Sequence, residues 1–164
     1  MAKDEITFQP IGIIRSPHQE LAGMPIQPAA AAGVKGTVVL DLSFQEGLKD
    51  LEEFSQVILV YYFHQAKLPD LLVTPFLDDV KHGVFATRAP RRPNGIGISV
   101  VKLMAIEGNI LEVENLDILD DTPLLDIKPY VPDFDEQEEV RIGWLESSRG
   151  KINKKMSDDR FLRD

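Results

Sequence analysis

Three arginines lie close together between two prolines in the segment VFATRAPRRPNGIGISVV, residues 84–101. The arginines are Arg88, Arg91 and Arg92, and the prolines are Pro90 and Pro93. Proline fixes the φ angle and so reduces the conformations that a loop can sample. Guanidinium groups bind phosphates or carboxylates through paired hydrogen bonds. A solvated surface turn is the alternative, but the flanking prolines favour a rigid anion-binding loop.

A second group of polar side chains occurs in segment 120–130, DDTPLLDIKPY. In an extended chain, alternate side chains share one face, so Asp126, Lys128 and Tyr130 are predicted to converge. A carboxylate, an amine and a phenol together can carry out acid–base chemistry. The alternative is a turn and an edge strand in which Asp126 and Lys128 are merely paired. The spacing alone leaves both interpretations open.

Several common kinds of site are absent from the sequence. It has no GxxxxGK[ST] phosphate-binding loop, and the pair Gly95 and Gly97 lacks the third glycine of a dinucleotide-binding turn. The three histidines, His18, His64 and His82, do not have the spacing of a helical metal pair, so no metal site is predicted. Zero cysteines exclude disulfides, thiolate metal sites and a cysteine nucleophile.

The 164 residues predict one soluble domain with a hydrophobic core. No apolar run approaches the roughly 20 residues that span a bilayer, and the N-terminus lacks the apolar core of a signal peptide. We therefore expect a cytoplasmic protein. The net charge of −9 argues against a general nucleic-acid binder. A local basic face around the arginines remains compatible with that charge, because salt screens exposed charges beyond about 10 Å.

The elements that must position these residues are mainly strands. Apolar and alternating runs predict strands at 6–15, 34–42, 55–64, 83–87, 96–107, 110–116 and 124–130. Ser43 and Glu46 fit a capping box that would begin a short helix. Segments 18–33 and 65–82 are predicted to be long functional loops. Strands this closely spaced leave no room for crossover helices, so the fold is predicted to be mainly all-β, an antiparallel β-barrel with short helices.

Two parts of the chain are distinguished. Residues 1–135 form the predicted barrel domain, and residues 136–164 form a C-terminal tail, either a short helix or disordered, that packs on the barrel or extends from it. The tail is acidic at first and then basic.

Taken together, the motifs resemble one family. The motifs are Ile11–Pro17, Phe63–Gln65, Val84–Arg88, Arg92–Asn94, Ile96–Ser99 and Asp126–Tyr130, and they occur in the family's order. The family is the TsaA-like family, which includes the tRNA N6-threonylcarbamoyladenosine methyltransferase, and the resemblance covers about residues 6–133. It implies a β-barrel, S-adenosylmethionine as methyl donor, and a homodimer with the cofactor pocket near the subunit interface.

By resemblance, the substrate is the modified adenosine beside the tRNA anticodon, and the cofactor contacts come from the following residues: Gln27, Pro28, His64, Gln65, Arg88, Arg92, Leu103, Asp120, Asp121, Thr122 and Pro123. The string Asp126, Lys128 and Tyr130 is assigned to catalysis. The acceptor nitrogen must lose a proton, and Tyr130 or Asp126 is the hypothesised base, with His64 as a third candidate.

The sequence departs from the family's pattern at two points. Gly95 follows Asn94 where many relatives have proline, and the turn reads Asp120-Asp121 where some relatives have glycine second. Two other functions remain open: methylation of another small or nucleotide substrate, and a dimeric S-adenosylmethionine-binding protein without catalysis.

Overall fold

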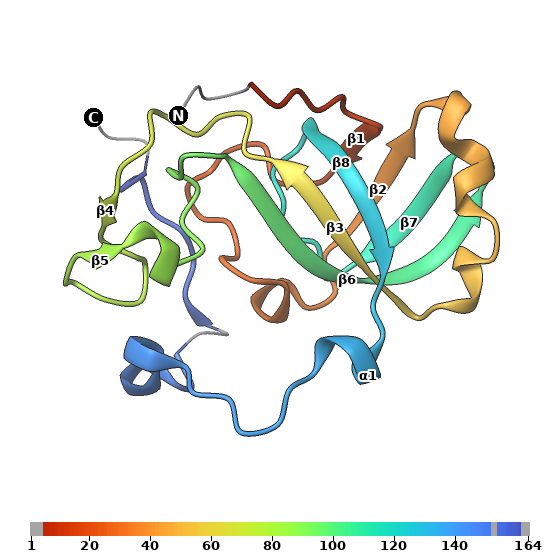
Figure 1. Cartoon of the computed structure of the whole chain (residues 1–164). Coiled ribbons are helices and arrows are strands. Elements are labelled where there is room, and N and C mark those ends of the chain that lie inside the picture. Colours follow the sequence, from red (N-terminus) through yellow and green to blue (C-terminus); the bar gives the residue numbers. More distant parts are fainter. Residues whose placement is uncertain (1–4, 152–153, 162–164) are drawn as a thin grey trace.

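The computed structural model describes residues 5–151 and 154–161. Six strands close into an antiparallel barrel in the order β1-β2-β7-β6-β3-β8 (Figure 1). Their bounds are β1 Gly12–Arg15, β2 Lys35–Leu40, β3 Gln56–Tyr62, β6 Ile96–Glu107, β7 Ile110–Glu114 and β8 Thr122–Pro129. The predicted antiparallel β-barrel is confirmed.

Alternation along the strands builds the core. Val57, Leu59 and Tyr61 of β3 point into the barrel and are at most 6% exposed, whereas the residues between them are partly or fully exposed. The same alternation on β6 turns Ser99 and Val101 inward. Side chains that alternate between two faces are what a sheet with one buried face requires. The barrel interior is therefore a packed core rather than a channel.

Neighbouring strands are held in a defined register. Val60 of β3 lies opposite Ile98 of β6 on one side and Asp126 of β8 on the other. β6 and β7 form the predicted hairpin, whose turn residue Gly108 has a φ of 60°. A left-handed turn residue of this kind favours glycine, which has no Cβ to clash.

The structure corrects three local predictions. The first strand begins at Gly12 rather than at residue 6. The short helix η2 (Leu42–Leu48) is capped by Asp41, which accepts the Ser43 N–H at 2.9 Å, so Ser43 is not the cap. In place of a strand at 83–87, the two-residue β5 (His82–Gly83) pairs with β4 (Leu72–Val73) and leads into the 3₁₀ turn η4 (Val84–Ala86).

The remaining helices are all short: η1 (Pro28–Ala31), η3 (Leu51–Glu53), α1 (Pro132–Asp135) and η5 (Gly143–Ser148). No helix in the described part of the chain is long and apolar enough to cross a membrane.

The segment after β8 is a folded extension that packs on the loops between β3 and β6 (Figure 1). Trp144 stacks on His82 at 4.5 Å and donates its indole N–H to the Ala86 carbonyl at 2.8 Å. Phe161 packs against Phe76 in a small apolar cluster with Val73, Val84 and Ala89. Residues 152–153 and 162–164 of the predicted tail lie outside the described residues. The two apolar clusters give the molecule a barrel and, beside it, a separate layer of loops.

Candidate functional site at the barrel mouth

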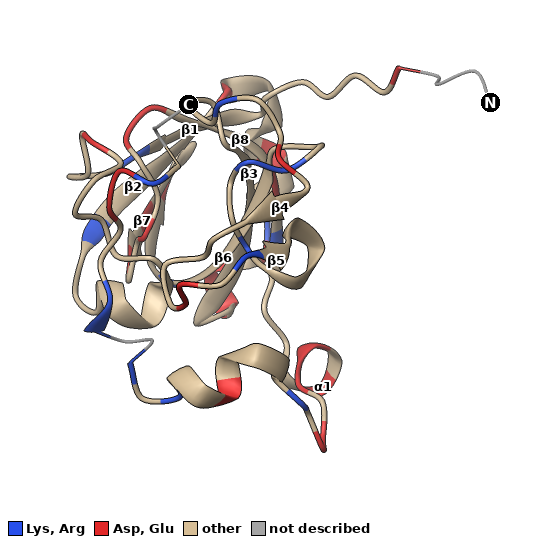
Figure 2. Ribbon diagram, turned by 90° about the vertical axis from the view of Figure 1, so that its left-hand side faces the viewer, with Lys and Arg blue, Asp and Glu red and all other residues tan. Residues whose placement is uncertain are grey.

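One end of the barrel collects most of the predicted site. The antiparallel order puts the last residues of β1, β3 and β7 and the first residues of β2, β6 and β8 at the same end, which we call the mouth. The long loops 16–34 and 63–95 both belong to it. Figure 2 looks toward this side of the molecule, where acidic and basic residues occur around the ring of strands. A barrel that brings six strand ends together can gather residues that are far apart in the sequence.

The turn before β8 is tied to the loop after β1. Asp120 accepts the Ser16 backbone N–H at 2.9 Å and the Gln19 amide at 3.0 Å. The Ser16 hydrogen bond is the main cause of the lowered pKa of Asp120. Asp121, with a φ of 59°, forms an ion pair with Arg15. Both carboxylates of this turn are therefore held in place by donors from β1 and the following loop.

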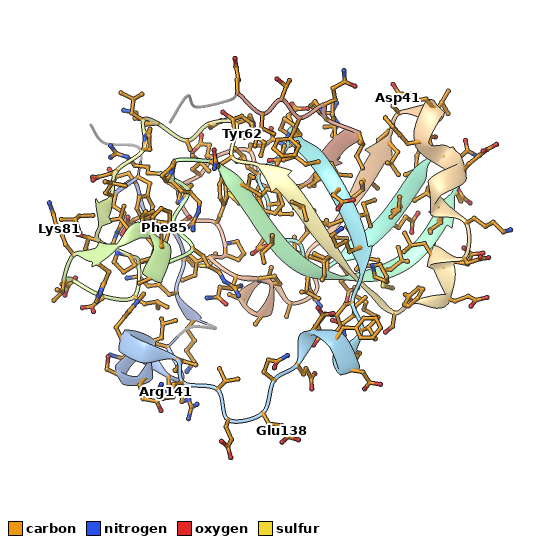
Figure 3. The ribbon with its side chains drawn as sticks, viewed as in Figure 1. Asp41, Tyr62, Lys81, Phe85, Glu138 and Arg141 are labelled. Atoms are coloured by element: carbon orange, nitrogen blue, oxygen red, sulfur yellow. The ribbon has the colours of Figure 1, made fainter. Side chains whose placement is uncertain are left out.

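His64 and Thr122 meet across the mouth. The Thr122 hydroxyl donates to the Leu119 carbonyl at 2.7 Å and lies 3.5 Å from His64 Nδ1. His64 immediately follows the strand end at Tyr62 and Phe63, and Gln65 beside it is exposed. The structure thus brings together two segments that the sequence placed in one pocket. Figure 3 shows Tyr62 at the end of β3, with Phe85 on the neighbouring loops.

The three arginines have different surroundings. Arg92 Nη1 donates to the carbonyls of Thr87 at 3.0 Å and Ala89 at 3.2 Å, so it holds its own loop together. Arg91 donates to the Leu68 carbonyl at 3.0 Å. Arg88 is exposed and forms no hydrogen bond or ion pair with a described residue, but its charge acts on Asp117 and Tyr61. Arg88 is the arginine best able to bind an anion at the mouth.

Gln27 and Pro28 begin η1 in the loop before β2. Gln27 is the N-cap residue, but its side chain makes no capping hydrogen bond, and both residues are partly buried. The C-terminal segment fixes this loop: the Met24 N–H donates to Ser157 Oγ at 2.8 Å, and the Ser157 N–H donates to the Met24 carbonyl at 2.7 Å. The same segment therefore holds both long loops of the mouth.

Leu103 lies in the barrel core. It is 9% exposed and pairs with Val113 of β7, one residue before that strand ends at Glu114. The predicted cofactor contact of Leu103 stays a prediction.

The string Asp126, Lys128 and Tyr130 is also separate from the mouth residues. Ile127 packs on the core, so its neighbours point outward, and Lys128 Nζ lies 2.7 Å from Asp126 Oδ2 in an exposed ion pair. Tyr130 donates to Glu136 at 3.1 Å instead of joining them. Asp126 borders a pocket of about 490 Å³ beside η2, at the opposite end of the barrel. The predicted convergence of all three side chains is not observed.

A polar chain inside the mouth was not predicted. Tyr61 Oη lies 3.1 Å from Ser99 Oγ, which donates to Asp117 Oδ1 at 2.7 Å. Burial raises the pKa of Asp117 to about 6. Asp117 precedes the turn at 120–123, and Ser99 lies in the motif at 96–99. Their position in or near these segments was the only signal in the sequence that could have indicated a functional role.

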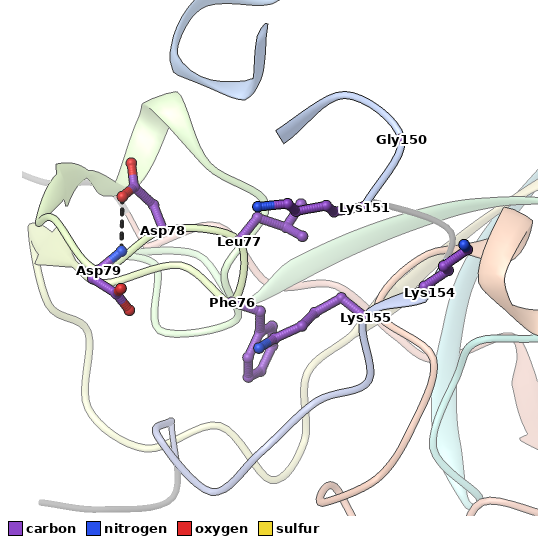
Figure 4. Close-up of a pocket in the computed structure, with 8 residues that line it drawn as sticks. All are labelled: Phe76, Leu77, Asp78, Asp79, Gly150, Lys151, Lys154 and Lys155. Carbon is purple, nitrogen blue, oxygen red and sulfur yellow. Dashed lines mark hydrogen bonds between the residues drawn. The ribbon is translucent and has the colours of Figure 1, made fainter. Parts of the chain in front are cut away.

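A basic pocket of about 410 Å³ lies between the loop layer and the C-terminal segment (Figure 4). Lys151, Lys154 and Lys155 line it together with Phe76 and the acidic pair at 78–79. Asp78 is already paired with His82 at 2.9 Å, which lowers the pKa of Asp78. Three lysines are therefore gathered at one place in a chain whose net charge is −9. Among the residues with described positions, no group of three or more His, Asp or Glu could hold a metal ion.

The family model for the N-terminal domain of tRNA-methyltransferase O matches residues 13–136, which include the mouth turn and all six barrel strands except Gly12, the first residue of β1. The chain belongs to this family. A solved structure titled as TrmO from Pseudomonas aeruginosa superposes with a TM-score of 0.72 and 44% sequence identity, over 85% of this chain and 62% of that one. The predicted family and barrel are both confirmed by these matches.

Two curated relatives are similar over most of this chain. A Pyrococcus abyssi protein named as a probable S-adenosyl-L-methionine-binding protein is 59% identical over 157 residues, 96% of this chain and 85% of the relative. The mouse tRNA (adenine(37)-N6)-methyltransferase is 33% identical over 141 residues, 82% of this chain but 33% of the relative. The cofactor and the reaction class predicted from the motifs agree with these names. The chain spans only part of the mouse protein and of the Pseudomonas TrmO.

Proposed function

We propose that this member of the tRNA-methyltransferase O family is an S-adenosylmethionine-dependent methyltransferase. Its proposed target is N6 of the threonylcarbamoyladenosine beside the tRNA anticodon. The observation that carries the proposal is the gathering of His64, Thr122, Asp120 and Arg88 at one barrel mouth, on three segments within the region that the family model matches. The names of relatives that bind this cofactor or methylate tRNA adenosine support it.

The residues at the mouth fit the chemistry of the cofactor. When bound, S-adenosylmethionine supplies a methyl group activated by a cationic sulfonium. Arg88 is suited to a carboxylate, because its guanidinium makes no hydrogen bond or ion pair with any described residue. The carboxylates of Asp117 and Asp120 give the mouth negative charge suited to a cation. Gln27, Gln65 and His64 can supply polar contacts to the remaining groups.

The chain's main contribution to methyl transfer is positioning. Holding two reactants in line contributes roughly 7–11 kcal/mol to lowering a barrier. Loops fixed by Arg92 and by the C-terminal segment give the mouth a defined shape for this. The acceptor nitrogen must also lose a proton, which requires a base near the mouth.

A tRNA substrate is supported by the basic pocket next to the mouth. Lysines bind phosphate as point charges without reading sequence, which suits contacts to the backbone of a tRNA. Such a substrate places the protein where tRNA is, and we propose the cytoplasm.

A homodimer is also proposed, on the basis of the outer face of the barrel. Tyr62, Ile96 and Ile98 lie on the paired strands β3 and β6, Ile13 lies on β1 beyond the intervening β8, and all four are 37–51% exposed. Apolar side chains that gather on an outer sheet face are typical of surfaces that pair with another protein. Light scattering coupled to gel filtration should give twice the chain mass, and Ile98→Lys should give the chain mass.

The function is tested with methyl-labelled cofactor and tRNA from a strain that lacks the methylation. Label in tRNA, and none in tRNA that lacks the threonylcarbamoyl group, is the expected result. Label in both RNAs would point to another acceptor. Cofactor binding without transfer to RNA, or to a panel of nucleosides, would support a binding protein without catalysis.

Arg88→Ala tests the mouth within that assay. Loss of a charge-assisted hydrogen bond of about 1.5–3 kcal/mol should weaken cofactor or tRNA binding about 10- to 150-fold. Arg141→Ala is the matched control, because Arg141 is an exposed arginine on the C-terminal segment (Figure 3). Equal affinities for the two variants would exclude Arg88 from the site.

A further inference from the structure

The polar chain in the mouth stands out against an apolar barrel. Tyr61 comes from β3, Ser99 from β6, and Asp117 from the segment that joins β7 to β8. Ser99 is 3% exposed and Tyr61 is 6% exposed, among core neighbours such as Leu59 and Val101. Replacing both partners of a buried hydrogen bond by apolar groups of the same shape is often nearly neutral or stabilising. The fold by itself does not require these hydroxyls and this carboxylate.

The backbone makes room for the chain. A Cβ on Gly97 would lie 2.4 Å from Tyr61 Cε2 and 2.7 Å from Cζ, much closer than real Cβ contacts. Glycine at this position lets the Tyr61 ring lie against β6, where its hydroxyl reaches Ser99. The arrangement is therefore built by at least four positions rather than by a chance contact.

The surroundings make Asp117 a stronger base than an ordinary carboxylate. Burial raises its pKa to about 6, although the Ser99 hydrogen bond and the Arg88 charge both act to lower it. Burial and the charge of Asp117 raise the pKa of Tyr61, so the phenol stays protonated. His18 approaches from the loop after β1 and bonds to the Leu116 carbonyl at 3.0 Å. At neutral pH Asp117 is thus mostly ionised yet accepts a proton more readily than its neighbours.

The other acidic groups are less suited to accept a proton. Asp120 has a lowered pKa because the Ser16 N–H stabilises its charge. Asp121 and Asp126 are in ion pairs with Arg15 and Lys128. Tyr130 has a raised pKa, since burial and its hydrogen bond to Glu136 favour the protonated phenol. Asp117 is therefore a further candidate beside the bases hypothesised from the sequence.

We propose that Asp117 is the proton acceptor of the methyl transfer and that Ser99 sets its basicity. The proposal rests on the proposed function. The N6–H bond breaks and its proton passes to an oxygen of Asp117. The nitrogen electron pair forms the new N–C bond, and the electron pair of the C–S bond stays on sulfur, which becomes a neutral thioether. Asp117 then releases the proton to water, which its acidity allows at neutral pH.

Asp117→Asn keeps the shape and the Ser99 hydrogen bond but removes the base. Methyl transfer should fall about 10²–10⁴-fold when it is measured at saturating cofactor, which removes any effect of the lost negative charge on cofactor binding. In the parent, kcat/KM should rise with pH and level off above about pH 6, and this acid limb should vanish in the variant. The proposal would be overturned if Asp117→Asn kept the parental rate and the parental acid limb. It would also be overturned if only His64→Asn lost them.

Ser99→Ala gives an independent readout that a purely structural role would not move. It removes a hydrogen bond that lowers the pKa of Asp117, so the acid limb should shift to higher pH. Tyr61→Phe, one hydrogen bond farther away, should shift the limb less. An unshifted limb in Ser99→Ala overturns the proposal even where Asp117→Asn fails to fold. A parent that binds cofactor but methylates no tRNA would instead overturn the proposed function, and this proposal with it.

Discussion

The barrel and the loop layer beside it are held together in different ways. The barrel has continuous strand pairing and one core that includes the fully buried Ile14, Leu59 and Leu124. The loop layer has a two-stranded sheet and a small apolar cluster of Val73, Val84, Ala89 and Phe161, with Phe76 packed against it. Its other ties include single side chains that bond to backbone carbonyls, such as Trp144 to Ala86 and Ser148 to Leu77.

Because of this difference, we expect the barrel to be rigid and the loop layer to be more adaptable. Binding residues are often carried by loops on a rigid scaffold, and segments with few buried contacts open at low free-energy cost. Here the polar chain Tyr61–Ser99–Asp117 lies inside the barrel mouth, whereas Arg88 and the lysine pocket lie on the loops. The chemistry is thus placed on the rigid part and the recognition of a large substrate on the adjustable part.

The largest expected effect is on stability and comes from truncating one buried side chain in each apolar cluster. Leu59→Ala should lower the free energy of unfolding by about 2–5 kcal/mol, because Leu59 is fully buried in the barrel. Phe161→Ala should lower it much less but should speed hydrogen exchange at amides of the loop layer, including the Val84 and Thr87 N–H groups. Denaturant titration and exchange mass spectrometry measure the two effects.

Ile110→Ala is a control for the Leu59 substitution, because Ile110 lies on a barrel strand but is 38% exposed. Similar losses of global stability in Leu59→Ala and Phe161→Ala would mean that barrel and loop layer unfold as one unit. The proposed division of roles would then fail.

A smaller effect separates stability from catalysis within the barrel. The folded state binds the proton of Asp117 more tightly than the unfolded chain, whose carboxyl has its ordinary pKa near 3.8. The charged form is therefore a cost to stability that grows as pH rises from about 4 to about 6 and persists above it. Asp117→Asn should gain stability relative to the parent across this range and keep the gain at pH 7.

Melting temperatures of both proteins at pH 4, 5, 6 and 7 check this expectation. Asp126→Asn is the matched control, because this exposed carboxylate is paired with Lys128 and should show no such gain. A constant difference between Asp117→Asn and the parent at every pH would contradict the raised pKa. A stabilising substitution that abolishes turnover is the pattern expected of a functional carboxylate.

The smallest effect concerns the loop layer's contact with RNA. Replacing Lys151, Lys154 and Lys155 with alanine should reduce the slope of log affinity for tRNA against log salt by about 2, at roughly 0.7 per phosphate contact. Fluorescence anisotropy between 50 and 200 mM salt gives the slope. Lys49→Ala with Lys102→Ala removes charge elsewhere on the barrel and should leave the slope nearly unchanged. Equal slopes in both variants would remove the pocket from the RNA surface.

Much of the fold was predictable because strands carry a local signal. The continuous apolar run at 55–64, the strand-like run at 96–107 and the glycine turn at 108 predict strands and a hairpin that the structure contains. Two local predictions failed. Asp41 rather than Ser43 caps the helix at 42–48, and residues 84–86 form a 3₁₀ turn rather than a strand. The arginine segment was predicted to bind an anion, but its three arginines could not be told apart by residue type alone.

The sequence by itself determined the family, most strands of an antiparallel barrel and the family motifs, because these depend on residue types and short-range periodicity. Only the tertiary structure decided which side chains meet. Asp126, Lys128 and Tyr130 share a face by spacing, yet Tyr130 turns to Glu136. Tyr61 and Ser99 are 38 residues apart in the sequence, and Ser99 and Asp117 are 18 residues apart. They meet because barrel closure brings three segments to one mouth. Burial then changes the acidity of Asp117, a property that no isolated segment possesses.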